Sequence, residues 1–182
     1  MQLYNGKYIE NFFNFNVKEF FDVESLAHSC SLQARFTGHS KFPIWVSQHM
    51  RLSSELALLA GESTDIVLGC HIHDLSEGFS GDLNRCIKHL PGLEIYKIRE
   101  NFIEHEIFRI HGLKITDSFL SIIKYYDNVT LSTEAHWAMD TNLPCWQEHL
   151  SKFPSRKYIL LQEEDWREAK KQWLERYYFL TQ

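Results

Sequence analysis

The sequence has 182 residues, of which 44% are hydrophobic and 14% aromatic, and a formal net charge of −5. This composition is typical of one globular domain with a substantial core and argues against disorder. The mild negative charge gives no general basic field for binding a nucleic-acid duplex, and no apolar run approaches the roughly 18 residues that a membrane span needs.

Hydrophobic residues recur at helical spacing along most of the chain, and only 8 glycines and 4 prolines interrupt it. We expect helices over residues 22–36, 44–61, 62–74, 93–112, 115–139 and about 162–180, with a loop-rich segment at 76–92 and an irregular one at 140–158. Pro43 suits the start of the second helix and Gly61 its end. The predicted fold is therefore all-α, a single-domain bundle of about six or seven helices spanning residues 1–182.

The last predicted helix has one apolar stripe along its length. Acidic residues lead this helix and basic residues come later, which complements the helix dipole. The stripe consists of Trp166, Ala169, Trp173 and Tyr177. We expect it to dock the helix on the body of the protein; the alternative is a subunit interface.

The cysteines show no metal-binding or disulfide pattern. Cys30, Cys70, Cys86 and Cys145 are widely spread, without CxxC spacing, and are expected to be reduced thiols. The opening stretch MQLYNGKYIENFFNF has neither the basic nor the long apolar part of a secretory signal. These observations predict a soluble cytoplasmic protein.

Residues 71–83, HIHDLSEGFSGDL, are rich in acids and contain two histidines. His71 and His73 differ by two positions, about 200° on a helix, so they cannot both face one centre. Adjacency to Asp74 at the helix end favours His73 as the functional residue. The six histidines at positions 28, 89, 105, 111, 136 and 149 are most simply surface or packing residues.

Two other predicted helices carry polar residues in strongly apolar surroundings. His49 lies in IWVSQHMRLSSELALL, and Asp127 lies in FLSIIKYYDNVTL, where an unpaired carboxylate would be costly. With His73 and Asp74 they offer two imidazoles and two carboxylates, a neutral mixed N/O shell for a divalent ion. Taken singly, His49 would be a core histidine whose hydrogen bonds are satisfied, and Asp127 would make a hydrogen bond between two helices. The set of four predicts a metal site with positions left for water and substrate.

The order His…His-Asp…Asp resembles the HD-domain metal-dependent phosphohydrolases, in particular their small deoxynucleotide-acting branch of 5′-deoxynucleotidases and phage dATP triphosphohydrolases. Three stretches within residues 22–140 carry the resemblance: RFTGHSKFPIWVSQH, HDLSEGFSGDLNRCIK and YYDNVTLSTEAHWAM. The resemblance implies an HD-type helical domain in which His49, His73, Asp74 and Asp127 bind the catalytic ion (Co, Mn, Zn or Mg). It also implies a homo-oligomer, a dimer or hexamer, and a cytoplasmic location (the host cytoplasm for a phage protein).

The same resemblance implies roles for further residues. Glu77 takes the place of the catalytic carboxylate, and Asp82 that of a second acid that orients water, binds substrate or helps hold a further ion. Arg35 matches the phosphate- or sugar-contacting arginine, and Lys88 matches the lysine that follows the second acid. On charge alone, Arg35 and Lys88, with Lys124 as a third cation, would neutralise the phosphate oxygens. Phe36 occupies the aromatic position near the nucleoside. This chain departs from the family at Asn84, Arg85 and Cys86, which replace a proline-rich turn, and at Tyr126, where a small residue is usual.

We therefore expect a divalent-metal-dependent phosphohydrolase of deoxynucleotides, with dATP-preferring triphosphohydrolase activity favoured over 5′-deoxynucleotidase activity. A non-catalytic HD module is the alternative from another class, but it predicts missing ligands, and all four are present. An HD enzyme acting on a cyclic nucleotide or an alarmone is a further alternative. Glu77 is followed by Gly78 rather than by the acidic partner of alarmone-type enzymes, and this difference argues against an alarmone substrate.

Overall fold

Helices form all the regular secondary structure of the described residues. The computed structural model covers residues 1–182, except for the side chain of Cys86. Seven helices have nine or more residues, which confirms the predicted all-α bundle: α2 (Val23–Ser31), α3 (Val46–Leu59), α4 (Thr64–Ile72), α7 (Glu94–Ile110), α8 (Asp117–Ala138), α9 (Pro144–Lys152) and α10 (Trp166–Leu180). Four-residue segments make up α1 (Val17–Phe20), α5 (Glu77–Ser80), α6 (Arg85–Lys88) and the 3-10 helix η1 (Arg35–Gly38).

The connection between α2 and α3 is longer than predicted. The first long helix ends at Ser31 instead of continuing to residue 36. Phe36 and Thr37 have φ angles of 56° and 55°, and left-handed backbone at consecutive non-glycine residues cannot continue a right-handed helix. Pro43 also differs from its predicted place, because α3 begins only after its N-cap residue Trp45.

The segment predicted as irregular, residues 140–158, contains the helix α9. Pro144 stands in its first turn, where the missing N–H of proline leaves no helical hydrogen bond unmade. The last helix begins at Trp166 rather than at residue 162, because Asp165 caps it by accepting a hydrogen bond from the backbone N–H of Arg167.

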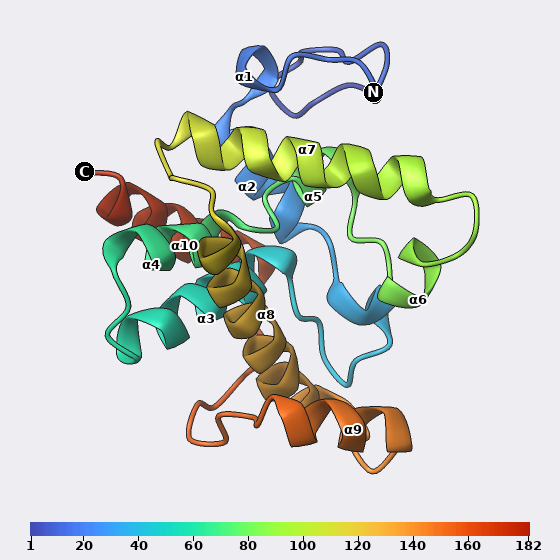
Figure 1. Ribbon diagram of the computed structural model, residues 1–182, viewed down its shortest axis with the longest axis vertical. Coiled ribbons are helices and arrows are strands. Elements are labelled where there is room, and N and C mark those ends of the chain that lie inside the picture. Colours follow the sequence, from blue (N-terminus) through green and yellow to red (C-terminus); the bar gives the residue numbers. More distant parts are fainter.

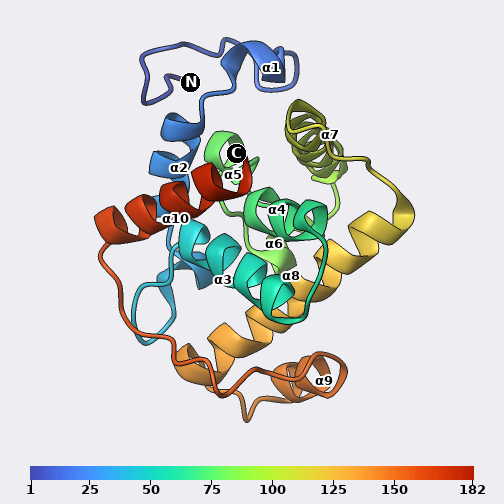
Figure 2. The same cartoon turned by 90° about the vertical axis from the view of Figure 1, so that its left-hand side faces the viewer.

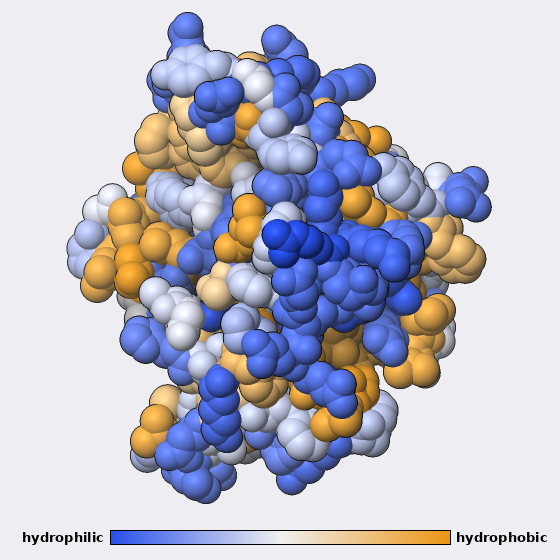
Figure 3. Space-filling view, turned by 180° about the vertical axis from the view of Figure 1, so that it is seen from behind, coloured by the Kyte–Doolittle hydropathy of each residue, from blue (hydrophilic) through white to orange (hydrophobic). Residues whose placement is uncertain are grey.

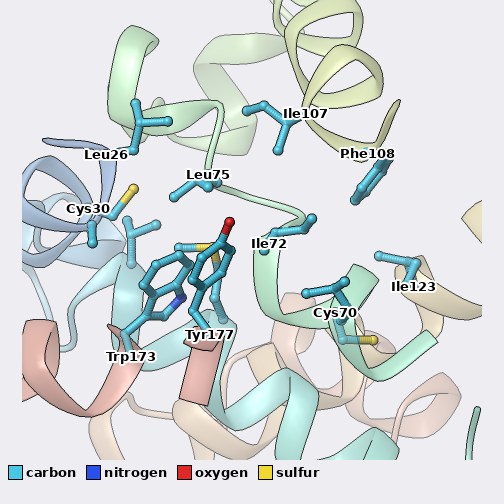
Figure 4. Packing of buried hydrophobic residues seen from close by; sticks show 14 of the residues in the cluster. Leu26, Cys30, Cys70, Ile72, Leu75, Ile107, Phe108, Ile123, Trp173 and Tyr177 are labelled. Atoms are coloured by element: carbon cyan, nitrogen blue, oxygen red, sulfur yellow. The ribbon is translucent and has the colours of Figure 1, made fainter. Parts of the chain in front are cut away.

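One hydrophobic cluster holds the helices together. Its buried members run from Leu3 near the N-terminus to Tyr177 in α10. Figure 4 shows side chains from α2, α4, α7, α8 and α10 meeting in this cluster, with the rings of Trp173 and Tyr177 stacked at a centroid distance of 5.4 Å. Burying such large apolar groups is the main favourable contribution to folding.

Helix α10 docks on the body of the protein, as its apolar stripe predicts. It packs against α2, α3 and α4, and Trp173 is fully buried, with Ala169 and Tyr177 also buried and Trp166 half-buried. Seen from behind, where α10 and α2 lie, the surface is mainly hydrophilic at its centre, with hydrophobic residues gathered toward the edges (Figure 3).

Helices α3, α4 and α8 form the frame of the candidate site. The first two pack side by side, and α8, the longest helix, crosses both of them (Figures 1 and 2). Helix α7 lies above this crossing, where it contacts α1, α4 and α6. No helix in the described part of the chain is long and apolar enough to cross a membrane.

Candidate active site

Two histidines from different helices meet at the crossing of α3, α4 and α8. His49 lies in the first turn of α3, and His73 is the C-cap of α4; their ring centroids are 5.2 Å apart. Both side chains are buried, with exposed fractions of 0% and 4%. Oδ2 of Asp74 lies 3.6 Å from Nε2 of His49 and 3.3 Å from Nε2 of His73. These three residues form a group that could hold a metal ion.

The second nitrogen of each imidazole is fixed by a hydrogen-bond acceptor. Nδ1 of His73 lies 2.9 Å from the carbonyl oxygen of Cys70, and Nδ1 of His49 lies 2.9 Å from Oε1 of Glu134. A proton assigned to Nδ1 satisfies both bonds and leaves a lone pair on each Nε2. Both Nε2 atoms are buried and make no hydrogen bond of acceptable geometry. Buried polar atoms need partners, and two imidazole lone pairs facing a carboxylate suit a divalent cation.

Asp127, the fourth predicted ligand, lies at the edge of this group. Its Oδ1 is 3.2 Å from Nε2 of His49 and 4.0 Å from Nε2 of His73. Its Oδ2 accepts a hydrogen bond from Lys124, one turn earlier on α8. Asp127 therefore lies beside the group of His49, His73 and Asp74 without belonging to it, between the histidines and the ammonium of Lys124.

The charges at the centre favour a cation. Burial alone would lower the pKa of His73, but the carboxylates of Asp74 and Asp127 raise it to about 9. Burial would raise the pKa of Asp74, and the neighbouring imidazoles of His73 and His49 instead hold it below its usual value. At this centre the positive charge of the imidazoles and the negative charge of the carboxylates therefore stabilise each other. A divalent ion would meet the same demand for positive charge.

Glu77 stands one turn beyond the histidine–aspartate pair, at the start of α5. It is 4% exposed, its Oε1 accepts a bond from Nζ of Lys88 at 3.1 Å, and its Oε2 is buried without a partner. Burial, followed by the negative charges of Asp74 and Asp82, raises the pKa of Glu77 well above its usual value. A carboxyl group of this kind can hold a proton near neutral pH and exchange it with a reacting group.

A cleft of about 680 Å³ opens onto this centre. All the predicted catalytic and substrate-binding residues line it, namely Arg35, Phe36, Glu77, Asp82, Lys88 and Lys124. Glu77 and Asp82 do not join His49, His73 and Asp74 in one close group, and no second group of this kind occurs among the described side chains. The possible second ion near these two acids therefore stays a prediction.

Glu134 and Asp74 hold the side chain of Arg35 in place, so it does not project freely into the cleft. Its Nε donates to Oε2 of Glu134 at 3.1 Å, and its Nη1 lies 3.6 Å from Oδ2 of Asp74. The left-handed backbone of Phe36 and Thr37 turns the chain immediately after this arginine. Such backbone is strained in non-glycine residues, and strain of this kind tends to be found at functional sites.

Three acidic residues of the site have no role in the predictions from sequence. Glu134 binds both His49 and Arg35, and Glu100 of α7 accepts from Nζ of Lys88 at 3.0 Å. Glu104, also on α7, lines the cleft, and burial raises its pKa to about 7. A signal for Glu134 does exist, because it follows Asp127 by seven residues and so shares its face of an apolar helix. Nothing local singles out the other two among the acids of α7.

His71 faces away from the centre, as its spacing from His73 predicts. It is fully buried, stacks on the ring of Trp173 at 4.7 Å, and its Nε2 lies 3.0 Å from the Trp173 carbonyl. Burial lowers the pKa of His71 to about 3. Of the six other histidines expected on the surface or in packing, His89 and His105 line the cleft.

The cysteines agree with the prediction of free thiols as far as they are described. Cys30 and Cys70 are buried, Cys145 is exposed, and all three are unpaired. The prediction for Cys86 concerns a side chain outside the described part of the structure.

Comparison of the chain with models of known protein families, and with characterised proteins, gave no match.

Proposed function

We propose that the protein is a divalent-metal-dependent phosphohydrolase of deoxynucleotides, of the HD type. One observation carries most of the weight: two buried histidine Nε2 atoms without hydrogen-bond partners face the same carboxylate of Asp74. Structural histidines normally have both nitrogens satisfied when they are buried, as His71 does. His49, His73, Asp74 and Asp127 would hold the ion, which is Co, Mn, Zn or Mg.

The cleft residues have complementary tasks in such a reaction. A bound ion would polarise a phosphoryl oxygen and lower the pKa of water near it. Glu77 accepts or delivers a proton beside the centre, because it is buried there with one carboxylate oxygen unpaired. The guanidinium of Arg35 and the ammonium groups of Lys88 and Lys124 bind phosphate oxygens and stabilise the charge that shifts onto them.

The substrate we favour is a deoxynucleoside triphosphate such as dATP, hydrolysed to deoxynucleoside and triphosphate. A 5′-deoxynucleotidase acting on deoxynucleoside monophosphates is the second candidate, since the same metal group and the same acid serve it equally well. Phe36, on the rim of the cleft beside Arg35, offers a ring face for the nucleoside.

The direct test is turnover of each deoxynucleoside mono- and triphosphate with Mg²⁺, Mn²⁺, Co²⁺ or Zn²⁺, followed by identification of the phosphate product. Triphosphate release identifies the favoured activity, and orthophosphate release from monophosphates identifies the second. The variant Asp74→Asn serves as the negative control in every reaction. Absence of any nucleotide turnover with all four metals would refute the proposed function.

A further inference from the structure

Two cations of the cleft differ from the others in having no carboxylate partner among the described side chains. Arg35, Lys88 and Lys124 each lie within ion-pair distance of an acid of the site. Arg85 of α6 and Lys97 of α7 also line the cleft, are exposed to solvent, and form no ion pair with a described residue. The positive charge of these two side chains is therefore available to a ligand.

Their positions extend the site away from the metal centre. Nη2 of Arg85 lies 3.4 Å from the amide oxygen of Asn128 on α8. Lys97 lines the same cleft from α7, one helical turn before Glu100. Figure 1 shows α6 next to the start of α7, with α8 farther along the chain crossing the molecule.

Lys88 of the same cleft has two acidic partners among the described side chains, which Arg85 and Lys97 lack. Nζ of Lys88 lies 3.1 Å from Oε1 of Glu77 and 3.0 Å from Oε1 of Glu100, so it shares its charge with two acidic residues. A monophosphate held at the metal centre would contact Arg35 and Lys124 and would not reach Arg85 and Lys97. A longer anionic ligand would be needed to reach Arg85 and Lys97 as well.

We propose that Arg85 and Lys97 form a subsite for the terminal phosphates of a nucleoside 5′-triphosphate. This inference rests on the proposed function and assigns the substrate class within it. A guanidinium binds phosphate oxygens through two parallel hydrogen bonds, and a lysine ammonium adds a mobile point charge. The arginine belongs to this chain's own departure from the family pattern at residues 84–86.

The chemistry at the centre is the same for both substrate classes. Water adds its oxygen to the α-phosphorus, the bond from that phosphorus to O5′ breaks, and O5′ takes a proton to become the deoxynucleoside hydroxyl. A triphosphate gives deoxynucleoside and triphosphate, and a monophosphate gives deoxynucleoside and orthophosphate. Because the reacting atoms do not differ, discrimination between the two must come from groups that contact the β- and γ-phosphates.

Binding of inorganic anions tests the subsite without any turnover. Isothermal titration calorimetry on protein stripped of metal would compare tripolyphosphate with orthophosphate. We expect wild-type protein to bind tripolyphosphate at least roughly tenfold more tightly, as charge-assisted contacts to two further phosphates imply. In Arg85→Ala/Lys97→Ala this preference should disappear. Equal affinity for both anions in the wild type, or an unchanged preference in the variant, would overturn the subsite.

A matched control removes the same charge elsewhere. Arg167→Ala/Lys171→Ala changes two exposed cations of α10 that do not line the cleft, with side chains 71% and 62% exposed. It should keep the wild-type preference for tripolyphosphate. A loss of preference equal to that of the cleft variant would show a general effect of net charge and would also overturn the subsite.

Turnover separates this inference from the proposed function. With Mn²⁺, the cleft variant should raise KM for dATP roughly tenfold or more and leave KM for dAMP within about twofold. Turnover with an unchanged KM for dATP in the variant would refute the subsite alone. Anion discrimination without turnover of either nucleotide would refute the proposed function and leave the subsite supported.

Discussion

Glu134 joins His49, a predicted metal ligand, to Arg35, a predicted substrate-binding residue. One of its carboxylate oxygens lies 2.9 Å from Nδ1 of His49, and the other accepts from Nε of Arg35 at 3.1 Å. The residue is fully buried in α8, seven positions after Asp127. It therefore fixes the orientation of the His49 ring and the position of the Arg35 guanidinium.

Replacing Glu134 by Gln should weaken metal binding by roughly 10- to 100-fold, the usual effect of losing a carboxylate that orients a ligand histidine. The amide could present its NH₂ group to Nδ1, which favours the wrong tautomer and moves the proton to Nε2. Calorimetric titration with Mn²⁺ or Zn²⁺ measures the change. Glu148→Gln is the matched control, since that side chain is 74% exposed on α9. Equal affinities for both variants would show that Glu134 does not position His49.

Asp74→Ala and Glu77→Ala should separate metal binding from proton transfer. The first removes a carboxylate that faces both imidazoles, so metal content and activity should both be lost. The second removes the buried acid beside the centre and should lower kcat by roughly 100- to 10,000-fold while metal content stays at the wild-type level. Metal analysis of the purified variants, alongside nucleotide turnover, checks both. Parallel loss of metal in Glu77→Ala would make Glu77 a ligand.

Trp173→Ala should destabilise the protein by about 3–5 kcal/mol, because a fully buried Trp leaves a large cavity. The substitution also removes the indole N–H that donates to the carbonyl of His71 at 3.1 Å. Urea unfolding measures the loss of free energy of unfolding. Phe179→Ala on the same helix is the control, since this ring is 74% exposed and its loss should cost less than about 0.5 kcal/mol.

His71 should make the protein less stable in acid. Burial lowers its folded pKa to about 3 from an ordinary value of 6.5, so the unfolded chain binds the proton more readily. The contribution is fully present above pH 6.5 and falls by up to about 1.4 kcal/mol per pH unit below it, or about 2–3 kcal/mol between pH 6.5 and 4.5. His73 acts in the opposite sense, because a raised folded pKa gives stability that is lost as the pH rises through about 9.

The comparison of wild type with His71→Asn isolates this contribution, since both proteins keep His73. The difference between their free energies of unfolding should shrink by about 2–3 kcal/mol as the pH falls from 6.5 to 4.5. A constant difference for His71→Asn would mean that the buried imidazole does not titrate in this range.

Much of the fold could be predicted because its signals are local. Apolar residues at helical spacing identify α3, α7, α8 and α10 directly, and the polar exceptions within them, His49 and Asp127, mark the site. The 200° separation of His71 and His73 correctly places them on different faces. The proximity of the four predicted ligands has a simple cause: polar residues that lie on the apolar faces of separate helices become neighbours when those faces pack into one core.

The remaining features depend on contacts between distant parts of the chain. Arg35 is held by Glu134, 99 positions later, and no local sequence pattern predicts such a pairing. The turn at Phe36 and Thr37 uses a backbone conformation that their side chains disfavour. The helix α9 escapes prediction because it is only nine residues long, carries few apolar residues and buries none of them.

The C-terminal part of the chain has the least motif content and still supports the two helices that carry the histidines. The backbone oxygen of Glu164 accepts from the indole N–H of Trp45 at 2.7 Å, and Trp45 is the N-cap of the helix that carries His49. Trp173 exchanges hydrogen bonds with His71, two residues before His73. A chain shortened before residue 159 would keep every predicted metal ligand but would lose both sets of hydrogen bonds. Searches for a minimal active fragment should therefore trim elsewhere, and affinity tags at this end call for a flexible spacer.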